Sequence, residues 1–173
     1  ELESALPWFA EQNAHLAKLH SDKRLPHALL LHGMSGIGKA QFAKGFAQFL
    51  LCQKEGGEAC GVCKSCELNA AGSHPDLFML SPEEEGKQLK VDQVRALGEF
   101  IYSTAQQGGY RVVIINPADS MNISSANALL KMLEEPGSDT LILLVTAKMG
   151  QVLPTIKSRC QHIECPTPPE SMA

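Results

Sequence analysis

The sequence predicts an α/β fold in which a parallel sheet of five strands is flanked by helices. Short apolar segments alternate along the chain with stretches whose apolar residues recur at helical spacing. The central apolar segments, such as Val112–Ile115 and Leu141–Val145, show no polar alternation, which is typical of strands buried on both faces of a parallel sheet. With 173 residues, of which 44% are hydrophobic, the chain is long enough for one complete core.

The expected elements are spread over the whole chain. Strands are predicted at His27–His32, Leu77–Leu80, Arg111–Ile115, Leu141–Thr146 and Gln161–Glu164. Helices are predicted at Pro7–His20, Ala40–Leu51, Leu68–Ala71 and Ser124–Glu135, and one more begins at an Asp92 cap, includes Tyr102 and is ended by Gly108–Gly109. We expect one domain over residues 1–165, followed in residues 166–173 by a proline-containing segment that begins a linker.

Charge and hydropathy exclude several classes of protein. The net charge of −4 argues against strong DNA binding by this domain alone, because neutralising phosphates requires a basic face. The longest apolar runs have the length of strands, well short of the roughly 20 residues of a membrane helix. Glu1–Trp8 lacks the pattern of a secretory signal. These observations predict a cytoplasmic protein without membrane contact, whose six cysteines are thiols or metal ligands.

A phosphate-binding loop is predicted where the first strand meets the following helix. Gly33, Gly36 and Gly38 let backbone N–H groups turn toward a phosphate, and Lys39 can reach the β- and γ-phosphates of ATP or ADP. The pattern departs from a complete P-loop at Ala40, where a Ser or Thr hydroxyl would help to hold Mg²⁺. The alternative is a glycine-rich turn that binds nothing.

The second half of an ATPase site is also incomplete. In ATPases an acidic residue after another strand holds Mg²⁺, and in many a following Glu polarises water. After the strand that ends at Ile115, these two positions hold Asn116 and Pro117. Asp119 is the remaining carboxylate, and it can equally be a turn or cap residue. Binding of ATP or ADP is therefore possible but expected to be weak or absent, and efficient hydrolysis is not expected.

Four cysteines after the phosphate-loop helix predict a metal site. They are Cys52, Cys60, Cys63 and Cys66. Their spacing fits four thiolates around a structural Zn²⁺, with an iron–sulfur cluster or unligated thiols as the alternatives. His74 is interpreted as a surface or core histidine, and Cys160 and Cys165 lie too far along the chain to be assigned to this site.

The arrangement resembles the bacterial clamp-loader subunits of the AAA+ class, in which a zinc module follows the P-loop helix. Val91–Arg95, Asn127–Pro136 and Leu153–Cys160 match further stretches of that family, the last through its Ser-Arg-Cys motif. The resemblance covers essentially the whole chain. It implies a P-loop AAA+ fold and a further lid domain beyond the linker.

Ala40, Asn116 and Pro117 depart from the family's motor subunits, gamma and tau, and resemble its stationary, ATPase-deficient member. That resemblance implies a hetero-pentamer with gamma or tau and delta, which loads a sliding clamp onto primer–template DNA within a DNA polymerase holoenzyme. It implies that Arg159 acts as an arginine finger in a neighbour's ATP site, where a surface salt bridge is the alternative. Thr146 matches the family's sensor position.

Three other functions compete with this one. The first is a catalytically active motor of the gamma or tau type. The second is a free-standing P-loop ATPase or kinase that uses Lys39, which would need Mg²⁺ ligands that the sequence does not offer. The third is a zinc-dependent nucleic-acid module, against which the acidic balance counts. Between Cys52 and Cys66 the basic residues are Lys54 and Lys64, too few for a phosphate-binding stripe.

Overall fold

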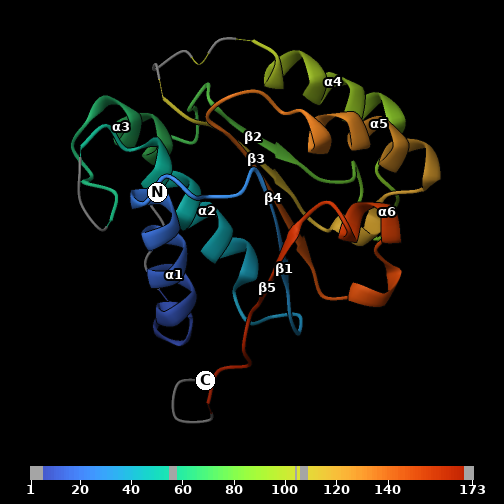
Figure 1. The fold of residues 1–173 in the computed structure, drawn as a ribbon, viewed down its shortest axis with the longest axis horizontal. Helices are drawn as coiled ribbons and strands as arrows, with labels where there is room; N and C mark the ends of the chain where they lie inside the picture. The colour runs from blue at the N-terminus through green and yellow to red at the C-terminus, as the bar shows by residue number, and fades with distance from the viewer. Residues whose placement is uncertain (1–5, 55–57, 104, 106–108, 170–173) are drawn as a thin grey trace.

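The structure, a computed structural model, describes residues 6–54, 58–103, 105 and 109–169. Five parallel strands form one sheet in the order β2-β3-β4-β1-β5, and helices cover both of its faces (Figure 1). The strands are β1 (Ala28–His32), β2 (Leu77–Leu80), β3 (Arg111–Ile115), β4 (Thr140–Thr146) and β5 (Gln161–Glu164). The predicted fold class and the five predicted strands are confirmed.

The helices alternate with the strands along the chain. They are α1 (Ala10–Ser21), α2 (Lys39–Leu51), α3 (Lys64–Ala70), α4 (Val91–Ile101), α5 (Ile123–Glu134) and α6 (Pro154–Lys157). Short 3₁₀ turns occur at Pro7–Phe9, Ala118–Ser120 and Met149–Gln151. No helix among the described residues is both long enough and apolar enough to cross a lipid bilayer.

Strand periodicity divides the core between the two faces of the sheet. Leu30, Val113 and Leu144 face α4, α5 and α6, whereas neighbouring residues such as Leu29 and Leu143 face α1 and α2. Side chains of successive strand residues point to opposite faces, so strands with helices on both sides must be apolar throughout. β3 and β4 are buried along their full length, while the edge strand β5 buries one residue in four.

The predicted beginning and end of α4 are both wrong. The cap residue is Lys90 instead of Asp92, and its backbone N–H donates to Gln93 Oε1 at 3.0 Å. The helix ends at Ile101 rather than at Gly108–Gly109. The carbonyl of Phe100 accepts a bond from the Ser103 hydroxyl and another from the Arg111 guanidinium, both at 2.8 Å, so the last turn is closed by side chains.

The short helix α3 begins earlier than predicted, at Lys64 instead of Leu68. The residue before it is Cys63, whose sulfur accepts the backbone N–H of Cys66 and caps the helix. A cysteine is not among the usual capping residues, so sequence preferences do not reveal this start. The helix thus grows directly out of the four-cysteine segment.

Candidate functional site

The predicted phosphate loop lies where expected, between the end of β1 and the start of α2. Gly38 has a φ of +91°, a conformation that disfavours residues with a side chain. Gly33 is required for another reason, because a Cβ there would lie 2.5 Å from the carbonyl oxygen of Cys165. The loop therefore has the backbone of a P-loop, packed against the segment that follows β5.

Residues before α1 hold this loop from one side. Trp8 Nε1 donates to the carbonyl of Ile37 at 2.8 Å, and the side chain of Leu6 occupies the space beside Gly38. Lys39 is only 6% exposed, and its ammonium donates to the carbonyl of Met34 within the same loop. Burial lowers the pKa of Lys39, against a smaller opposing effect of the nearby Cys165 thiol. The lysine that would bind a phosphate thus has a partner inside the loop.

A cleft of about 630 Å³ opens beside the loop. It brings together the sequence-predicted residues Gly36, Gly38, Lys39, Ala40, Asn116, Pro117 and Asp119, with Ser35, Glu85, Lys87 and Lys148 also in its wall, whereas Gly33 is not among its lining residues. Ala40 offers this cleft a methyl group and Asn116 an uncharged amide. The glycine loop and the segment after β3 therefore meet in this cleft, as predicted from the sequence. They lack the hydroxyl and the first carboxylate of a magnesium site.

Asp119 already has a hydrogen-bond partner in this cleft. It lies in the 3₁₀ turn Ala118–Ser120, and its Oδ1 accepts the hydroxyl of Thr146 at 2.5 Å. The Thr146 oxygen in turn accepts the backbone N–H of Lys148 at 2.9 Å. This chain of bonds joins the ends of β3 and β4, which fits a structural task for Asp119 and Thr146.

Arg159 lies away from the cleft, two residues after α6. Its Nε donates to Glu134 Oε1 at 2.7 Å, and its side chain is 34% exposed. Nη1 donates to the carbonyl of Thr155 at 2.9 Å and to the hydroxyl of Ser158 at 3.4 Å. The ion pair weighed as the alternative for Arg159 is therefore present within the chain. Sequence reasoning missed its acidic partner, Glu134, because the two residues come from distant segments.

The four predicted cysteines converge into one cluster. The ligand atoms of Cys52, Cys60, Cys63 and Cys66 all lie within 4.8 Å of one another. The Cys60–Cys66 and Cys52–Cys63 sulfur pairs are 3.8 and 3.9 Å apart. Four sulfurs bound tetrahedrally at about 2.3 Å would be about 3.8 Å apart. These separations fit one ion better than a multi-iron cluster, whose thiolates sit on different iron atoms.

Backbone N–H groups point at these sulfurs, as they would around thiolates. Donors include the amides of Val62 and Cys63 to Cys60 Sγ, at 3.4 and 3.3 Å, and the amide of Cys60 to Cys52 Sγ at 3.3 Å. The Val62 amide is the main cause that lowers the pKa of Cys60 to about 6, whereas burial raises the pKa of Cys66 to about 12. One thiol is thus poised to ionise, and a cation would favour ionisation of the others.

Ser65, in the helix that follows Cys63, forms a buried polar cluster with His74 and Asp76. His74 Nδ1 accepts the backbone N–H of Asp76 at 3.0 Å, so the neutral ring carries its proton on Nε2 and donates it to Ser65 Oγ, also 3.0 Å away. In this tautomer the histidine cannot take a proton from the serine, so the Ser65–His74 pair is not a nucleophilic centre. His74 is a core residue, in line with its interpretation from sequence.

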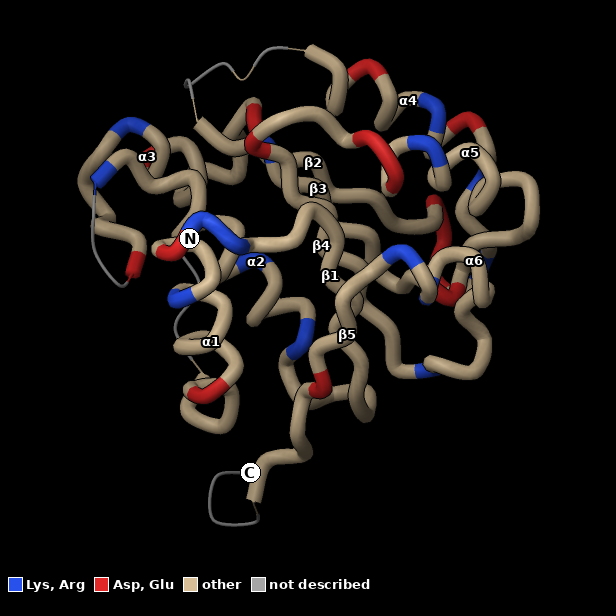
Figure 2. Tube along the Cα trace, viewed as in Figure 1, with Lys and Arg blue, Asp and Glu red and all other residues tan. Residues whose placement is uncertain are grey.

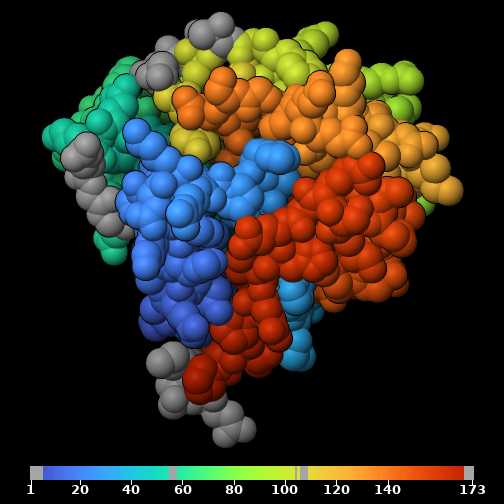
Figure 3. Space-filling view, in the orientation of Figure 1, coloured from blue at the N-terminus to red at the C-terminus, as the bar shows by residue number. Residues whose placement is uncertain are grey.

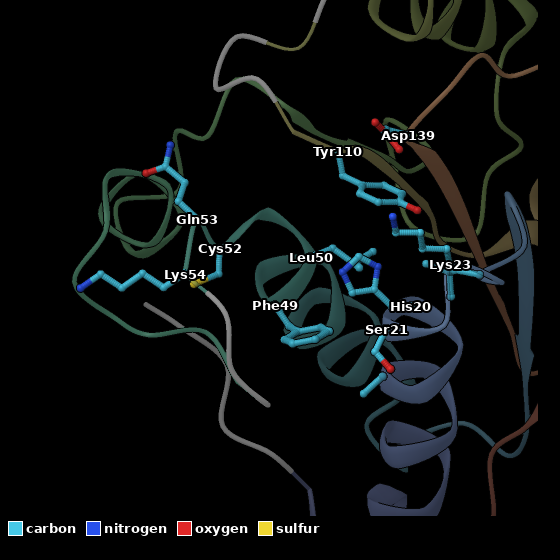
Figure 4. A pocket seen from close by; sticks show the side chains of 12 residues that line it. His20, Ser21, Lys23, Phe49, Leu50, Cys52, Gln53, Lys54, Tyr110 and Asp139 are labelled. Atoms are coloured by element: carbon cyan, nitrogen blue, oxygen red, sulfur yellow. The ribbon is translucent and has the colours of Figure 1, made fainter.

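A second groove, of about 880 Å³, lies between α1, the end of α2 and the residues that precede β3 and β4. His20 sits between Phe49 and Tyr110, with ring centroids 5.7 and 5.6 Å away (Figure 4). Burial lowers the pKa of His20, although the charge of Asp139 opposes the shift. No motif in the sequence indicated this groove, because its lining residues come from four separated segments.

The N- and C-terminal parts of the described chain meet on one face of the molecule (Figure 3). Gln12 Nε2 on α1 donates to the carbonyl of Glu164 at 3.4 Å, and the Cys165 amide donates to the carbonyl of His32 at 2.7 Å. Segments from both ends of the described chain therefore pack beside the glycine loop.

The fold and the glycine loop together define a P-loop domain of the AAA+ class. A solved Thermotoga maritima structure, titled a DNA polymerase III gamma subunit-related protein, has this fold. Its TM-score is 0.66 at 22% identity, and the match covers 92% of this chain and 47% of that one. The branch migration motor RuvB from Thermotoga maritima matches at a TM-score of 0.51 and 14% identity, over 89% of this chain and 43% of that one.

The chain belongs to the family described as DNA polymerase III, delta subunit, whose model matches residues 10–169. It is 50% identical over 163 residues to the protein named DNA polymerase III subunit delta' of Pseudomonas aeruginosa, over 94% of this chain and 49% of that protein. The protein of the same name from Escherichia coli K12 is 37% identical over 168 residues, 96% of this chain and 50% of that protein. The chain spans about half the length of these relatives.

Proposed function

We propose that this chain is the AAA+ domain of a clamp-loader subunit equivalent to DNA polymerase III subunit delta', which takes part in loading a sliding clamp without hydrolysing ATP itself. The cleft carries this proposal. It keeps a P-loop backbone, yet presents Ala40 and Asn116 where a motor would present Mg²⁺ ligands. The relatives named subunit delta' support the assignment to this subunit.

The engagement of Lys39 supports a lack of turnover as well. Its ammonium would have to leave the Met34 carbonyl before it could bind a phosphate. The competing motor or free-standing ATPase requires Lys39 and a bound Mg²⁺ together. Hydrolysis by the isolated chain that is abolished by Lys39→Ala would favour that alternative.

In this proposal the domain works through its neighbours. Its partners are gamma or tau motor subunits and a delta subunit in a hetero-pentamer. Through this assembly the domain acts on the clamp and on primer–template DNA in the cytoplasm. Basic and acidic residues are interspersed along the chain (Figure 2), which fits contact with DNA through the assembly rather than strong binding by this domain alone. Residues 1–165 form the AAA+ domain, and 166–173 begin the linker to a lid domain.

Arg159 is the residue that we propose to act in catalysis, by reaching the ATP phosphates bound to a neighbouring motor subunit. Its side chain is 34% exposed, and the planar guanidinium suits phosphate oxygens. An arginine supplied in trans can raise hydrolysis by about 10³ to 10⁵. The Ser158-Arg159-Cys160 motif supports this role.

The test is ATP hydrolysis by a clamp loader reconstituted with the full-length subunit. Arg159→Ala should lower the kcat of the complex strongly while leaving its assembly intact. Arg24→Ala removes an exposed arginine after α1 and is the matched control. Unchanged hydrolysis with Arg159→Ala would overturn the finger role.

We also propose that Cys52, Cys60, Cys63 and Cys66 hold one structural Zn²⁺. The short sulfur separations and the amide groups directed at sulfur support it. With four protein ligands the ion would have no open position for a substrate, so its contribution is to the fold.

A further inference from the structure

We infer that Glu134 is a positioning residue for Arg159: it holds the Nε of the guanidinium so that Nη2 is presented to the neighbouring subunit. This inference rests on the proposed trans role of Arg159 and extends it to a second residue. It comes from the hydrogen bonds of the Arg159 side chain and from the elements that carry both partners.

The bonds of Arg159 leave part of its guanidinium available. Glu134 Oε1 accepts from Nε, and the carbonyl of Thr155 and the hydroxyl of Ser158 accept from Nη1. A guanidinium has five N–H donors, two of them on Nη2. Within the described part of the chain no hydrogen bond uses Nη2. That amino group can therefore donate to a phosphate oxygen while the other two nitrogens stay fixed.

The two partners are held by well-packed elements. Glu134 is the last residue of α5, directly after Leu133, which is 1% exposed. Arg159 follows α6, in which Ile156 is fully buried in the same core. The carboxylate is thus fixed from one helix and the backbone of Arg159 from another, so the bond between them sets the direction of a long side chain.

The geometry argues against a lock that withholds Arg159 from a neighbour. A carboxylate that occupied the guanidinium fully would bind it side-on, with two parallel bonds from Nε and Nη2. Here Glu134 takes a bond from Nε alone. The side chain of Glu134 is also 52% exposed, and an exposed pair of this kind adds little to stability. Of the three roles considered for Glu134, namely locking Arg159, stabilising the fold and orienting Arg159, the last fits this geometry.

A reconstituted complex that contains the full-length subunit tests the inference. Glu134→Gln should lower the kcat for ATP about tenfold, less than removal of the finger, because a misdirected arginine is still present. The KM for ATP should change less than twofold, since a group that acts in the transition state affects kcat. Glu135→Gln makes the same charge change at the next residue, also exposed, and should leave kcat unchanged.

A double-mutant cycle separates positioning from a structural role. In an Arg159→Ala background, Glu134→Gln should have no further effect, because its effect passes through Arg159. A loss that persists in that background, an unchanged kcat, or a raised kcat with Glu134→Gln alone would each overturn the inference. A raised kcat would mean that Glu134 restrains the arginine. Glu134→Asp, which keeps the carboxylate, checks that a loss reflects this charge rather than misfolding, since it should retain more activity than Glu134→Gln.

If Arg159→Ala itself has no effect on hydrolysis, the proposed finger role fails first. If Arg159→Ala is strongly impaired while Glu134→Gln is normal, the finger role stands and only the positioning role fails. The two failures are therefore distinguishable in one series of complexes.

Discussion

At the residue scale, Lys39 and Arg159 differ in their burial and in the hydrogen-bond partners of their charged groups. Lys39 is buried, and its ammonium is directed back into the loop that carries it. Arg159 is half-exposed and anchored by Glu134 and Thr155, with one amino group left over. The ammonium of Lys39 is therefore held by its own loop, whereas the Nη2 group of Arg159 makes no hydrogen bond within the described residues.

His20 gives a prediction for the dependence of stability on pH. Its pKa is lowered in the folded chain, mainly because burial between Phe49 and Tyr110 disfavours the charged ring, against a smaller effect of Asp139. Below its ordinary pKa of about 6.5 the unfolded chain therefore binds a proton that the folded chain does not. The stability that the neutral His20 ring contributes is fully present above that pH. It is lost as the pH falls through the lowered pKa of His20 in the folded chain.

His20→Phe should keep the ring contacts and remove this titration. The urea midpoint of the variant should then fall less steeply than that of the original chain as the pH is lowered below about 6.5. Measurements at pH 8, where the ring is neutral in both states, separate any packing effect of the new ring. Equal slopes for the two proteins below pH 6.5 would show that His20 does not contribute.

At the element scale, α5 carries both the core of one sheet face and the Glu134 carboxylate. It contributes Leu129 and Leu133 to the core, and its start is fixed by a capping box. Asn122 Oδ1 accepts the Ser125 amide at 2.9 Å, and Ser125 Oγ accepts the Asn122 amide at 3.0 Å. The orientation of the helix, and hence of its last residue, depends on these contacts.

Asn122→Ala should therefore lower the free energy of unfolding by about 1 kcal/mol, because the first turn loses the side-chain acceptor of its cap. Urea denaturation of the 173-residue chain measures the change. Asn127→Ala, on the exposed face of the same helix, is the control and should be neutral or slightly stabilising, since Ala has the higher helix propensity. A loss at Asn122 no larger than that at Asn127 would contradict the capping role.

At the scale of the whole molecule, the parallel sheet was predictable because its central strands are apolar without interruption. The meeting of the glycine loop with Asn116 was also predictable, since the ends of parallel strands share one edge of a sheet. The bond from Lys39 to Met34 and the pair of Arg159 with Glu134 were not. Both depend on side-chain directions set by packing between distant segments, which no local pattern encodes.

The cysteine segment also acts on the scale of the whole molecule, because it joins the end of α2 to α3. Between Leu51 and Lys64 the structure has no helix or strand in its described residues, and Cys52 and Cys63 lie at the two ends of that stretch. A bound Zn²⁺ would hold those ends together in the folded state and be released from an unfolded chain. Metal binding and folding are therefore expected to be coupled.

Removal of metal should consequently lower the melting temperature of the chain. The purified protein should contain one equivalent of zinc by elemental analysis, and a strong chelator should shift the thermal transition downward. Cys60→Ala should show the lowered transition without chelator and respond little to it. Cys160→Ala, outside the cluster, should retain the response, because its thiol lies in the core on the other side of the sheet. Iron with visible absorption would identify a different metal centre. A transition that is the same with and without metal would mean that the four thiols converge without a metal contributing to stability.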